Sequence, residues 1–133
     1  MSTKMVRLFI AAALLPLLAS AALAQAQDAP GGRGGPFPFQ GGQAIFQGVC
    51  QGCHMPDAKG AVGAGAYPAL ADDAKLATAA YPISVVLHGQ KAMPPLGGML
   101  SDKQVADVVT YVRTHFGNKF ADKVTPDNVK LQR

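Results

Sequence analysis

Two thiols and one imidazole stand within five consecutive residues of this chain, Cys50-Gln51-Gly52-Cys53-His54. A Cys-x-x-Cys pair followed directly by His is the spacing typical of covalent haem attachment. On about one helical turn, Cys50 and Cys53 would meet the two vinyl groups of a haem, and His54 would lie beneath the iron as its proximal ligand. The 133 residues contain no further cysteine. The motif therefore predicts one haem c, bound covalently through Cys50 and Cys53.

Three other uses of a cysteine pair fit these residues less well. A structural zinc site needs about four ligands, and two cysteines with scattered histidines form no recognisable finger. A thioredoxin-like redox pair belongs to a βαβ setting, which the sequence does not indicate. A disulfide between Cys50 and Cys53 would close a very small loop and add little stability. Haem attachment is the favoured interpretation.

A second axial ligand is expected from a methionine, because His and Met commonly hold the iron of electron carriers. Met55 adjoins the proximal histidine and lies on its side of the ring, so Met93 and Met99 remain beyond the leader. Met93 precedes two prolines that stiffen its segment into an extended strap. Met99 stands just before a helix, where core packing is the commoner role. We expect Met93; His88 and His115 compete, but near helix ends a histidine often complements the helix dipole.

The first residues predict an export signal. Lys4 and Arg7 precede a short apolar stretch, and Ala22-Leu23-Ala24 offers the small-x-small pattern of a signal peptidase site, with residues 24–26 as a second candidate. A retained membrane anchor is less favoured, because spanning needs roughly 20 apolar residues and this stretch is much shorter. We expect residues 1–24 to be a signal peptide, and no membrane span after its cleavage.

Charge excludes one class of partner. The net charge is +4, and removal of Lys4 and Arg7 lowers it to +2. Lysine and arginine form no run in the sequence. A nucleic-acid-binding protein needs a concentrated basic surface, so nucleic acid is not an expected partner.

Helical signals dominate the remainder, and no segment alternates in the manner of a strand. The interpretation is all-α. Residues 25–41 are rich in Gly and Pro and predict a flexible arm, with Phe37 and Phe39 resting on the folded body. The expected elements are a helix over 42–51, a loop over 56–70, a short helix from Asp72 or Asp73 through Ala80, another from Pro82 to Gly89, a long one from Ser101 to Gly117, and a short one from Thr125.

The motifs together resemble class I, mitochondrial-like cytochromes c over Gly42 to about Asn118. The residues that carry the resemblance are Cys50-Gln51-Gly52-Cys53-His54, Tyr67-Pro68-Ala69-Leu70, Met93-Pro94 and the closing helix. The resemblance implies that the carbonyl of Pro68 accepts the free N–H of His54, which orients the ligand. It also implies that Leu70 contacts the haem.

Two helices would cross if the resemblance holds. In the family, a glycine and an aromatic residue of the first helix pack against the last helix. Gly42 and Phe46 match these positions, and Tyr111 matches the partner position on the last helix.

A narrower resemblance concerns Val86-Leu87-His88-Gly89, Met93 to Gly97, and Val124-Thr125-Pro126. These segments look like monohaem cytochrome subunits of bacterial periplasmic dehydrogenases. The resemblance implies a location in the periplasm and redox partners such as a dehydrogenase, a terminal oxidase or another cytochrome.

The expectations form one hypothesis. Residues 42–118 are a cytochrome c domain of four to five helices around one haem, and residues 119–133 are an extension with a short helix. The protein is a one-electron carrier between a dehydrogenase and the respiratory chain, not an enzyme. Two alternatives stay open: a haem-based sensor or peroxidase-like enzyme with a labile sixth ligand, and an anchoring subunit whose haem is incidental.

Overall fold

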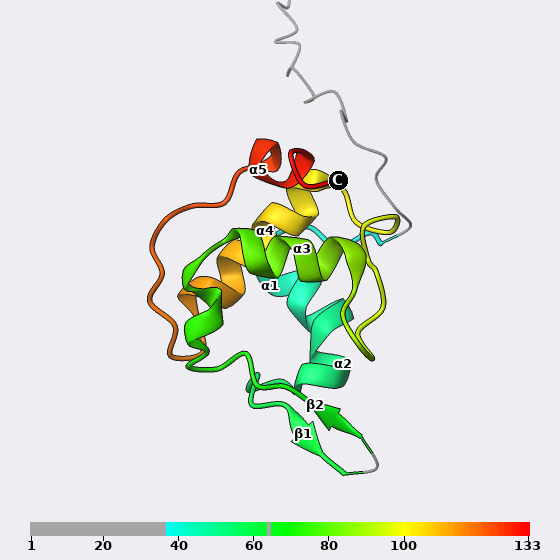
Figure 1. Ribbon diagram of the computed structural model, residues 1–133, viewed down its shortest axis with the longest axis vertical. Coiled ribbons are helices and arrows are strands. Elements are labelled where there is room, and N and C mark those ends of the chain that lie inside the picture. Colours follow the sequence, from blue (N-terminus) through cyan, green and yellow to red (C-terminus); the bar gives the residue numbers. More distant parts are fainter. Residues whose placement is uncertain (1–36, 64) are drawn as a thin grey trace, which may run out of the picture.

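The computed structural model describes residues 37–63 and 65–133. The predicted signal peptide and residues 25–36 of the predicted arm lie outside these ranges. The described chain is mainly helical, with one small hairpin at the end opposite the C-terminal helix (Figure 1). Its elements are α1 (Gly42–Ile45), a π-helical segment (Phe46–Cys50), α2 (Gln51–His54), β1 (Ala61–Val62), β2 (Ala66–Tyr67), a 3-10 helix (Ala74–Ala77), α3 (Ala80–His88), α4 (Asp102–Thr114) and α5 (Pro126–Lys130).

The long helix α4 begins where its capping residues predict. The Ser101 side chain accepts a bond from the Gln104 backbone, and the Gln104 side chain accepts one from the Ser101 backbone. This reciprocal capping box satisfies two amide groups that the first helical turn leaves free. Thr125 and Asn128 form the same arrangement at α5, with Pro126 in the first turn. Both predicted helix starts are confirmed.

The valines of α4 face the core. Val105, Val108 and Val109 are almost completely buried. Ile45 and Phe46 are buried with them and belong to the first helical segment, residues 42–54, which comprises α1, the π-helical segment and α2. Valine is a mediocre helix former, so α4 depends on this packing for its stability. Ile83 and Leu87 of α3, Leu100 before α4, and Val129 of α5 complete the same cluster.

The first helical segment crosses α4 at very close range. A Cβ atom on Gly42 would lie 2.3 Å from the Asp107 carbonyl oxygen and 2.4 Å from Tyr111 Cβ. One turn later, the rings of Phe46 and Tyr111 pack with centroids 5.8 Å apart. The predicted crossing is confirmed, and only glycine fits at its tightest point.

The arm also contacts α4 where the structure describes it. Phe37 and Phe39 are half-buried and stack with centroids 6.2 Å apart. Gln104 Nε2 donates to the carbonyl oxygens of both residues, each at 2.9 Å. The side-chain amide of Gln104, which caps α4, thus also binds the arm at Phe37 and Phe39.

Three sequence-based details were wrong. The segment expected as a loop contains an antiparallel hairpin, in which Ala61 pairs with Tyr67 and Val62 with Ala66. The helix expected to start at Pro82 begins two residues earlier, because the first four N–H groups of a helix need no intrahelical acceptor and a proline is tolerated among them.

The third detail is where two helices end. The short helix expected through Ala80 is a 3-10 helix that stops at Ala77, although Asp73 does cap it. The long helix ends at Thr114, before Phe116 takes a positive φ of 57°.

Candidate functional site

A cavity of about 880 Å³ lies among the helices, the hairpin and the segment that joins α3 to α4. Its size is within the usual range of sites that enclose a small ligand or cofactor. All six predicted site residues line it: Cys50, Cys53, His54, Pro68, Leu70 and Met93. They come from three separate stretches of sequence that the fold brings together.

The helical segment places both thiols and the imidazole at one wall. Cys50 ends the π-helical segment, and Cys53 and His54 lie in α2. Side chains three positions apart on a helix share a face, so both sulfur atoms belong to the same side. Cys53 is exposed, Cys50 is half-buried, and His54 is 8% exposed. Met55 then ends the helix with a φ of 67°.

His54 is oriented by a backbone carbonyl. Its Nδ1 lies 2.9 Å from the carbonyl oxygen of Pro68, 14 residues further along the chain. A carbonyl oxygen can only accept, so Nδ1 must carry the proton and donate. In the neutral ring Nε2 is then the unprotonated nitrogen. This arrangement prepares Nε2 as a ligand and fixes the plane of the ring.

The surroundings of Cys50 differ from those of a redox-active thiol. Burial in the apolar wall, assisted by the neighbouring Cys53, raises the pKa of the Cys50 thiol to about 12. Reactive cysteines of disulfide oxidoreductases show the opposite shift, because positive groups around them stabilise the thiolate. The environment of Cys50 therefore disfavours a thioredoxin-like use of the pair.

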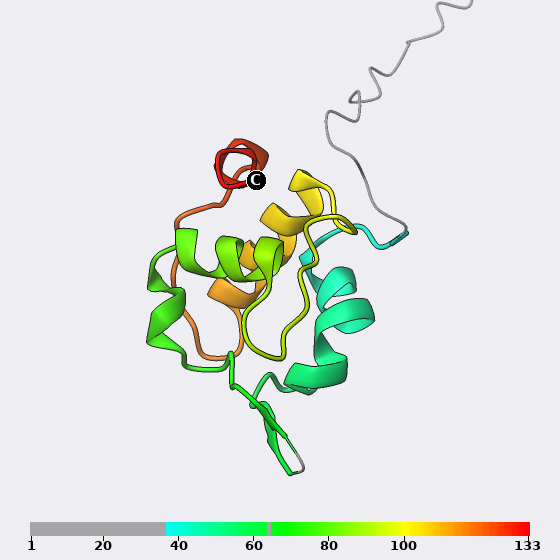
Figure 2. The same ribbon diagram turned by 45° about the vertical axis from the view of Figure 1, so that its right-hand side comes forward.

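The strap, residues 89–100, joins α3 to α4 (Figure 2) and contributes residues to the lining of the same cavity. It begins at Gly89, whose φ of 73° suits glycine, and a Cβ there would lie 2.6 Å from the carbonyl oxygen of Met93. Gln90 and Met93 then exchange two backbone hydrogen bonds of 3.0 and 2.9 Å, which close a tight turn. Met93 is half-buried and forms part of the cavity lining.

The cavity is apolar inside and basic at its edge. Val108, Val109 and Val112 of α4 line it, with Leu76 and Leu96. The charged groups of the lining are the exposed lysines Lys59, Lys75 and Lys91 and the half-buried Asp73, which leaves a positive excess. An apolar interior with cationic groups at the edge fits a flat hydrophobic macrocycle that carries two propionate groups. The residues present therefore fit a haem.

The rival ligands lie elsewhere. His88 is exposed, and its Nε2 donates to the Gln132 carbonyl oxygen at 2.8 Å. His115 is exposed, stacks on Tyr111 with centroids 4.0 Å apart, and contacts the Tyr111 carbonyl oxygen. Met99 is half-buried against the core. None of the three belongs to the described lining of the cavity.

Sequence reasoning missed a buried arginine behind the cavity. Arg113 is fully buried, and it donates to the carbonyl oxygens of Leu76 (2.8 Å), Ala77 (2.9 Å) and Asp122 (2.7 Å). It also pairs with the Asp122 carboxylate at 2.7 Å. It thereby ties the 3-10 helix, which forms part of the wall, to α4. Its burial could have been inferred from its position in the sequence. Arg113 follows Val109 by four residues and therefore lies on the same, buried side of the helix.

Within the described ranges, no helix has the length and apolar character needed to cross a bilayer.

The covalent-attachment motif, the oriented histidine and the apolar cavity within a helical fold define a c-type cytochrome, and comparison with known proteins agrees. The family model described as "Cytochrome C oxidase, cbb3-type, subunit III" matches residues 38–112, more than half of the chain. The chain belongs to this cytochrome c family, which confirms the expected class I cytochrome c fold. Haem c is the cofactor of the family, and electron transfer, not catalysis, is its role.

One curated relative is informative about context. The chain is 31% identical over 107 residues to the fructose dehydrogenase cytochrome subunit of Gluconobacter japonicus. The match covers 69% of this chain but only 22% of that relative. This chain therefore spans about a fifth of the length of the curated relative.

Proposed function

We propose that this protein binds one haem c through thioether bonds to Cys50 and Cys53, with His54 and Met93 as axial ligands. In this proposal it carries single electrons in the periplasm between a dehydrogenase and the respiratory chain. The observation that carries the proposal is the single cavity whose walls hold both cysteines, the oriented His54 and Met93.

Each residue has a separate task in this assignment. Cys50 and Cys53 tether the cofactor so that it cannot dissociate. The Pro68 carbonyl keeps the proton of His54 on Nδ1 and leaves Nε2 to bind the metal. Met93 supplies a thioether on the other side, a ligand that raises the reduction potential. When bound, the haem supplies a reversible one-electron change at its iron.

Two axial ligands favour a carrier over a sensor or a peroxidase-like enzyme. With His54 and Met93 in place, no coordination position remains for oxygen or peroxide. The chain's remaining contribution is to exclude water with the valine wall of α4 and to leave one edge of the cavity accessible to a partner.

The choice of partners rests on the comparisons and on the predicted leader. The relative from Gluconobacter is a dehydrogenase cytochrome subunit, which supports a dehydrogenase as electron donor. The description of the matching family refers to an oxidase, which supports a terminal oxidase or another cytochrome as acceptor. The signal peptide expected over residues 1–24 supports a periplasmic location. Electron-transfer complexes are usually weak and bury a small area.

Intact mass spectrometry tests covalent attachment. Protein purified from its native host is expected to carry the added mass of one haem on a chain that begins after the predicted cleavage site. The double variant Cys50→Ala/Cys53→Ala is expected to give little holoprotein. A mature chain without the added mass, or normal covalent haem in the double variant, contradicts the proposal.

Spectroscopy tests the axial ligands. The ferric protein is expected to show the Fe(III)–thioether charge-transfer band, and Met93→Ala is expected to abolish it. Met99→Ala is the matched control and should retain the band. Ready binding of carbon monoxide by the reduced wild-type protein at neutral pH would instead favour the sensor or enzyme.

Stopped-flow measurements test the partners. Mixing with a purified periplasmic dehydrogenase and its substrate is expected to reduce the haem at the rate of dehydrogenase turnover. Reduction much slower than turnover would favour an anchoring subunit whose haem takes no part.

A further inference from the structure

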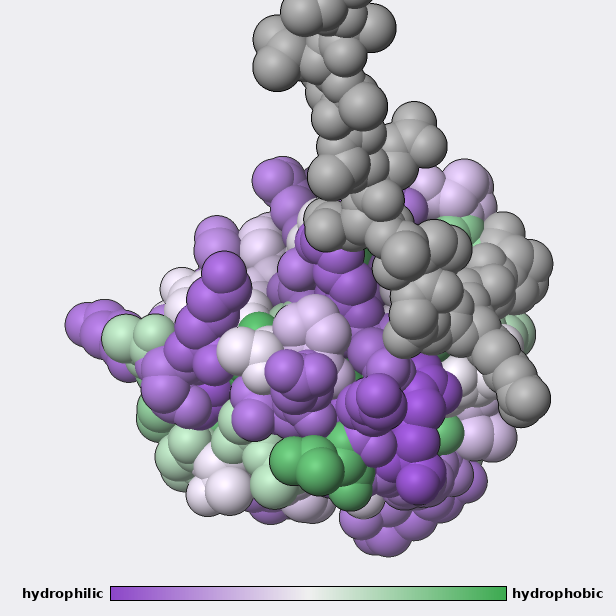
Figure 3. Space-filling model, turned by 90° about the horizontal axis from the view of Figure 1, so that it is seen from above, coloured by the Kyte–Doolittle hydropathy of each residue, from purple (hydrophilic) through white to green (hydrophobic). Residues whose placement is uncertain are grey.

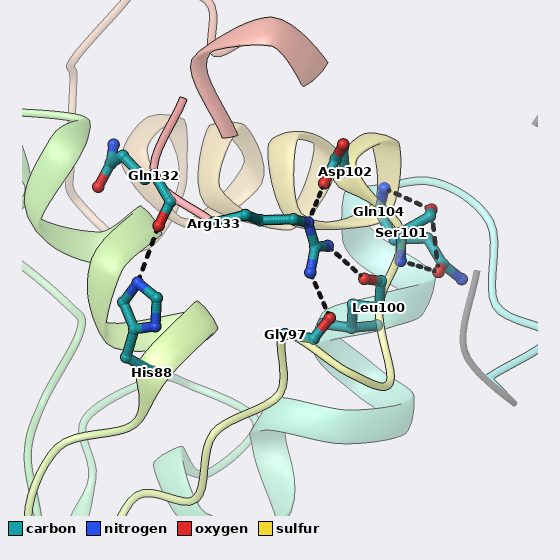
Figure 4. A network of polar contacts seen from close by, with 8 residues as sticks. All are labelled: His88, Gly97, Leu100, Ser101, Asp102, Gln104, Gln132 and Arg133. Atoms are coloured by element: carbon teal, nitrogen blue, oxygen red, sulfur yellow. Dashed lines mark hydrogen bonds and ion pairs between the residues drawn. The ribbon is translucent and has the colours of Figure 1, made fainter. Parts of the chain in front are cut away.

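Gln132 and Arg133 connect both ends of the strap to the rest of the fold (Figure 4). At the first end, His88 at the end of α3 donates from Nε2 to the Gln132 carbonyl oxygen at 2.8 Å. At the other end, the guanidinium of Arg133 points into the turn between the strap and α4. The C-terminal segment thus brackets the strap that carries Met93.

The Arg133 guanidinium makes three contacts at that turn. Nε pairs with the carboxylate of Asp102, Nη1 donates to the Gly97 carbonyl oxygen, and Nη2 donates to the Leu100 carbonyl oxygen at 2.8 Å. The Asp102 side chain is only 10% exposed. Hydrogen bonds with a charged partner are stronger than neutral ones, and a nearly buried carboxylate without its cation is costly. The three contacts therefore form one firm attachment.

Gly97 is held from two directions. Its N–H donates to the Leu87 carbonyl oxygen of α3 at 3.2 Å, while its own carbonyl oxygen accepts from Arg133. The preceding residue is held too, since the Leu96 N–H donates to the Val86 carbonyl oxygen at 2.8 Å. Arg133 therefore adds a connection to α4 and α5 that the strap's own bonds to α3 do not provide.

The strap between Gly97 and Met93 is stiff. Three residues separate them, and two are Pro94 and Pro95. Each proline fixes its own φ and restricts the residue before it to extended conformations. The third, Leu96, is buried and lines the cavity. A displacement of Gly97 is therefore transmitted to Met93 rather than absorbed between them.

We propose that Arg133 is a positioning residue for the sixth ligand: by holding Gly97, Leu100 and Asp102 together, it keeps Met93 in the cavity and opposes its displacement by other ligands. The His88–Gln132 contact, at the other end of the strap, likewise helps to keep Met93 in the cavity. This inference rests on the proposed function, specifically on Met93 as axial ligand. Arg133 touches neither the cavity lining nor the proposed cofactor, so its effect passes through the strap.

The attachment lies close to the surface of the molecule. The Arg133 side chain is 33% exposed. The face of the molecule seen from above, where α5 lies, is mostly hydrophilic (Figure 3).

Titration of the ferric holoprotein with imidazole tests the proposal, because imidazole binds only where Met93 has left the iron. Because the attachment to the strap is lost, Arg133→Gln should bind imidazole about tenfold more tightly than the wild type, which corresponds to about 1.4 kcal/mol. Arg133→Lys keeps the charge and should lie between Arg133→Gln and the wild type. His88→Ala should shift the affinity in the same direction by a smaller factor.

Two control variants separate positioning from general destabilisation. Lys130→Gln removes an exposed positive charge from the last turn of α5, three residues before Arg133, and should leave imidazole affinity unchanged. Ile45→Val removes one methylene from the core in the first helical segment, at a cost of about 0.5–1.5 kcal/mol. It should lower the thermal midpoint without altering imidazole affinity.

The outcomes distinguish the two proposals. If the thioether band is present in the wild type and absent in Met93→Ala, but Arg133→Gln binds imidazole no more tightly than Lys130→Gln, only the positioning role is wrong. If Met93→Ala keeps the band, the ligand assignment is wrong and the positioning role fails with it. A higher imidazole affinity in Arg133→Gln, with Ile45→Val unchanged, supports the inference.

Discussion

Substituting Gly42 with alanine tests how closely the first helical segment and α4 approach each other. The added Cβ would lie 2.3 Å from the Asp107 carbonyl oxygen, whereas ordinary van der Waals contact begins at 3.4 Å. The two helices must therefore separate by about 1 Å at this point, because both atoms that meet the new methyl group, including Tyr111 Cβ, are attached rigidly to the backbone.

The expected loss of stability follows from two opposing effects. Overpacking of a well-packed contact costs about 1–3 kcal/mol, and this rigid overlap belongs at the upper end of that range. Alanine recovers up to about 1 kcal/mol of helix propensity. The net loss is about 2 kcal/mol, which corresponds to a fall of about 10 °C in the thermal midpoint of a domain of this size. Thermal unfolding of the holoprotein, followed by far-UV circular dichroism, measures it.

Two other glycines of the same helical segment serve as controls. A Cβ on Gly52 has no neighbour within 4 Å, so Gly52→Ala should be neutral or stabilising by up to about 1 kcal/mol. A Cβ on Gly48 would meet the ring of Phe39 at 2.5 Å. That ring can move, so the loss should be smaller than for Gly42→Ala. If Gly42→Ala were as stable as Gly52→Ala, the reasoning from close approach would be wrong.

Three further predictions concern polar contacts. Arg113→Met should lower the free energy of unfolding by about 3 kcal/mol or more in urea, because the buried carbonyl groups it satisfies lose their partner. Gln104→Ala should cost about 1–2 kcal/mol, because it removes the α4 cap and the bonds to the arm together; Lys103→Ala, one residue earlier and exposed, should cost less. The bond from Arg113 lowers the pKa of Asp122, so its carboxylate contributes stability above the unfolded-state pKa and loses it as the pH falls through the folded-state value. The stability difference between wild type and Asp122→Asn should therefore shrink as the pH is lowered below about 4.

Each of these predictions has a contradicting result. Arg113→Met as stable as the wild type would mean that the carbonyl groups find other donors. Gln104→Ala no less stable than Lys103→Ala would mean that the arm and the cap contribute nothing measurable. A difference between wild type and Asp122→Asn that grows on acidification would reverse the expected sign.

The sequence was informative wherever a local pattern determines local structure. Ser101 with Gln104 and Thr125 with Pro126 mark helix starts, because these signals need only residues a few positions apart. The cysteine–histidine motif is similarly local. These elements required no knowledge of the tertiary fold.

Long-range partners were not predictable in the same way. The spacing of Arg113 from Val109 indicates a buried position, but not its acceptors at Leu76 and Ala77, which lie more than thirty positions away. Arg133 likewise meets Gly97 and Leu100 only after the chain has folded. The two-residue strands of the hairpin are too short to show alternation.

The valine face of α4 belongs at once to the helical core and to the cavity wall. A substitution at Val108, Val109 or Val112 must therefore satisfy folding and cofactor environment together, and few side chains meet both demands. Gln90, Lys91 and Ala92 of the strap line the cavity without belonging to the helical core. Substitutions that change the redox midpoint with little loss of stability are therefore expected at these three positions rather than on the valine face of α4.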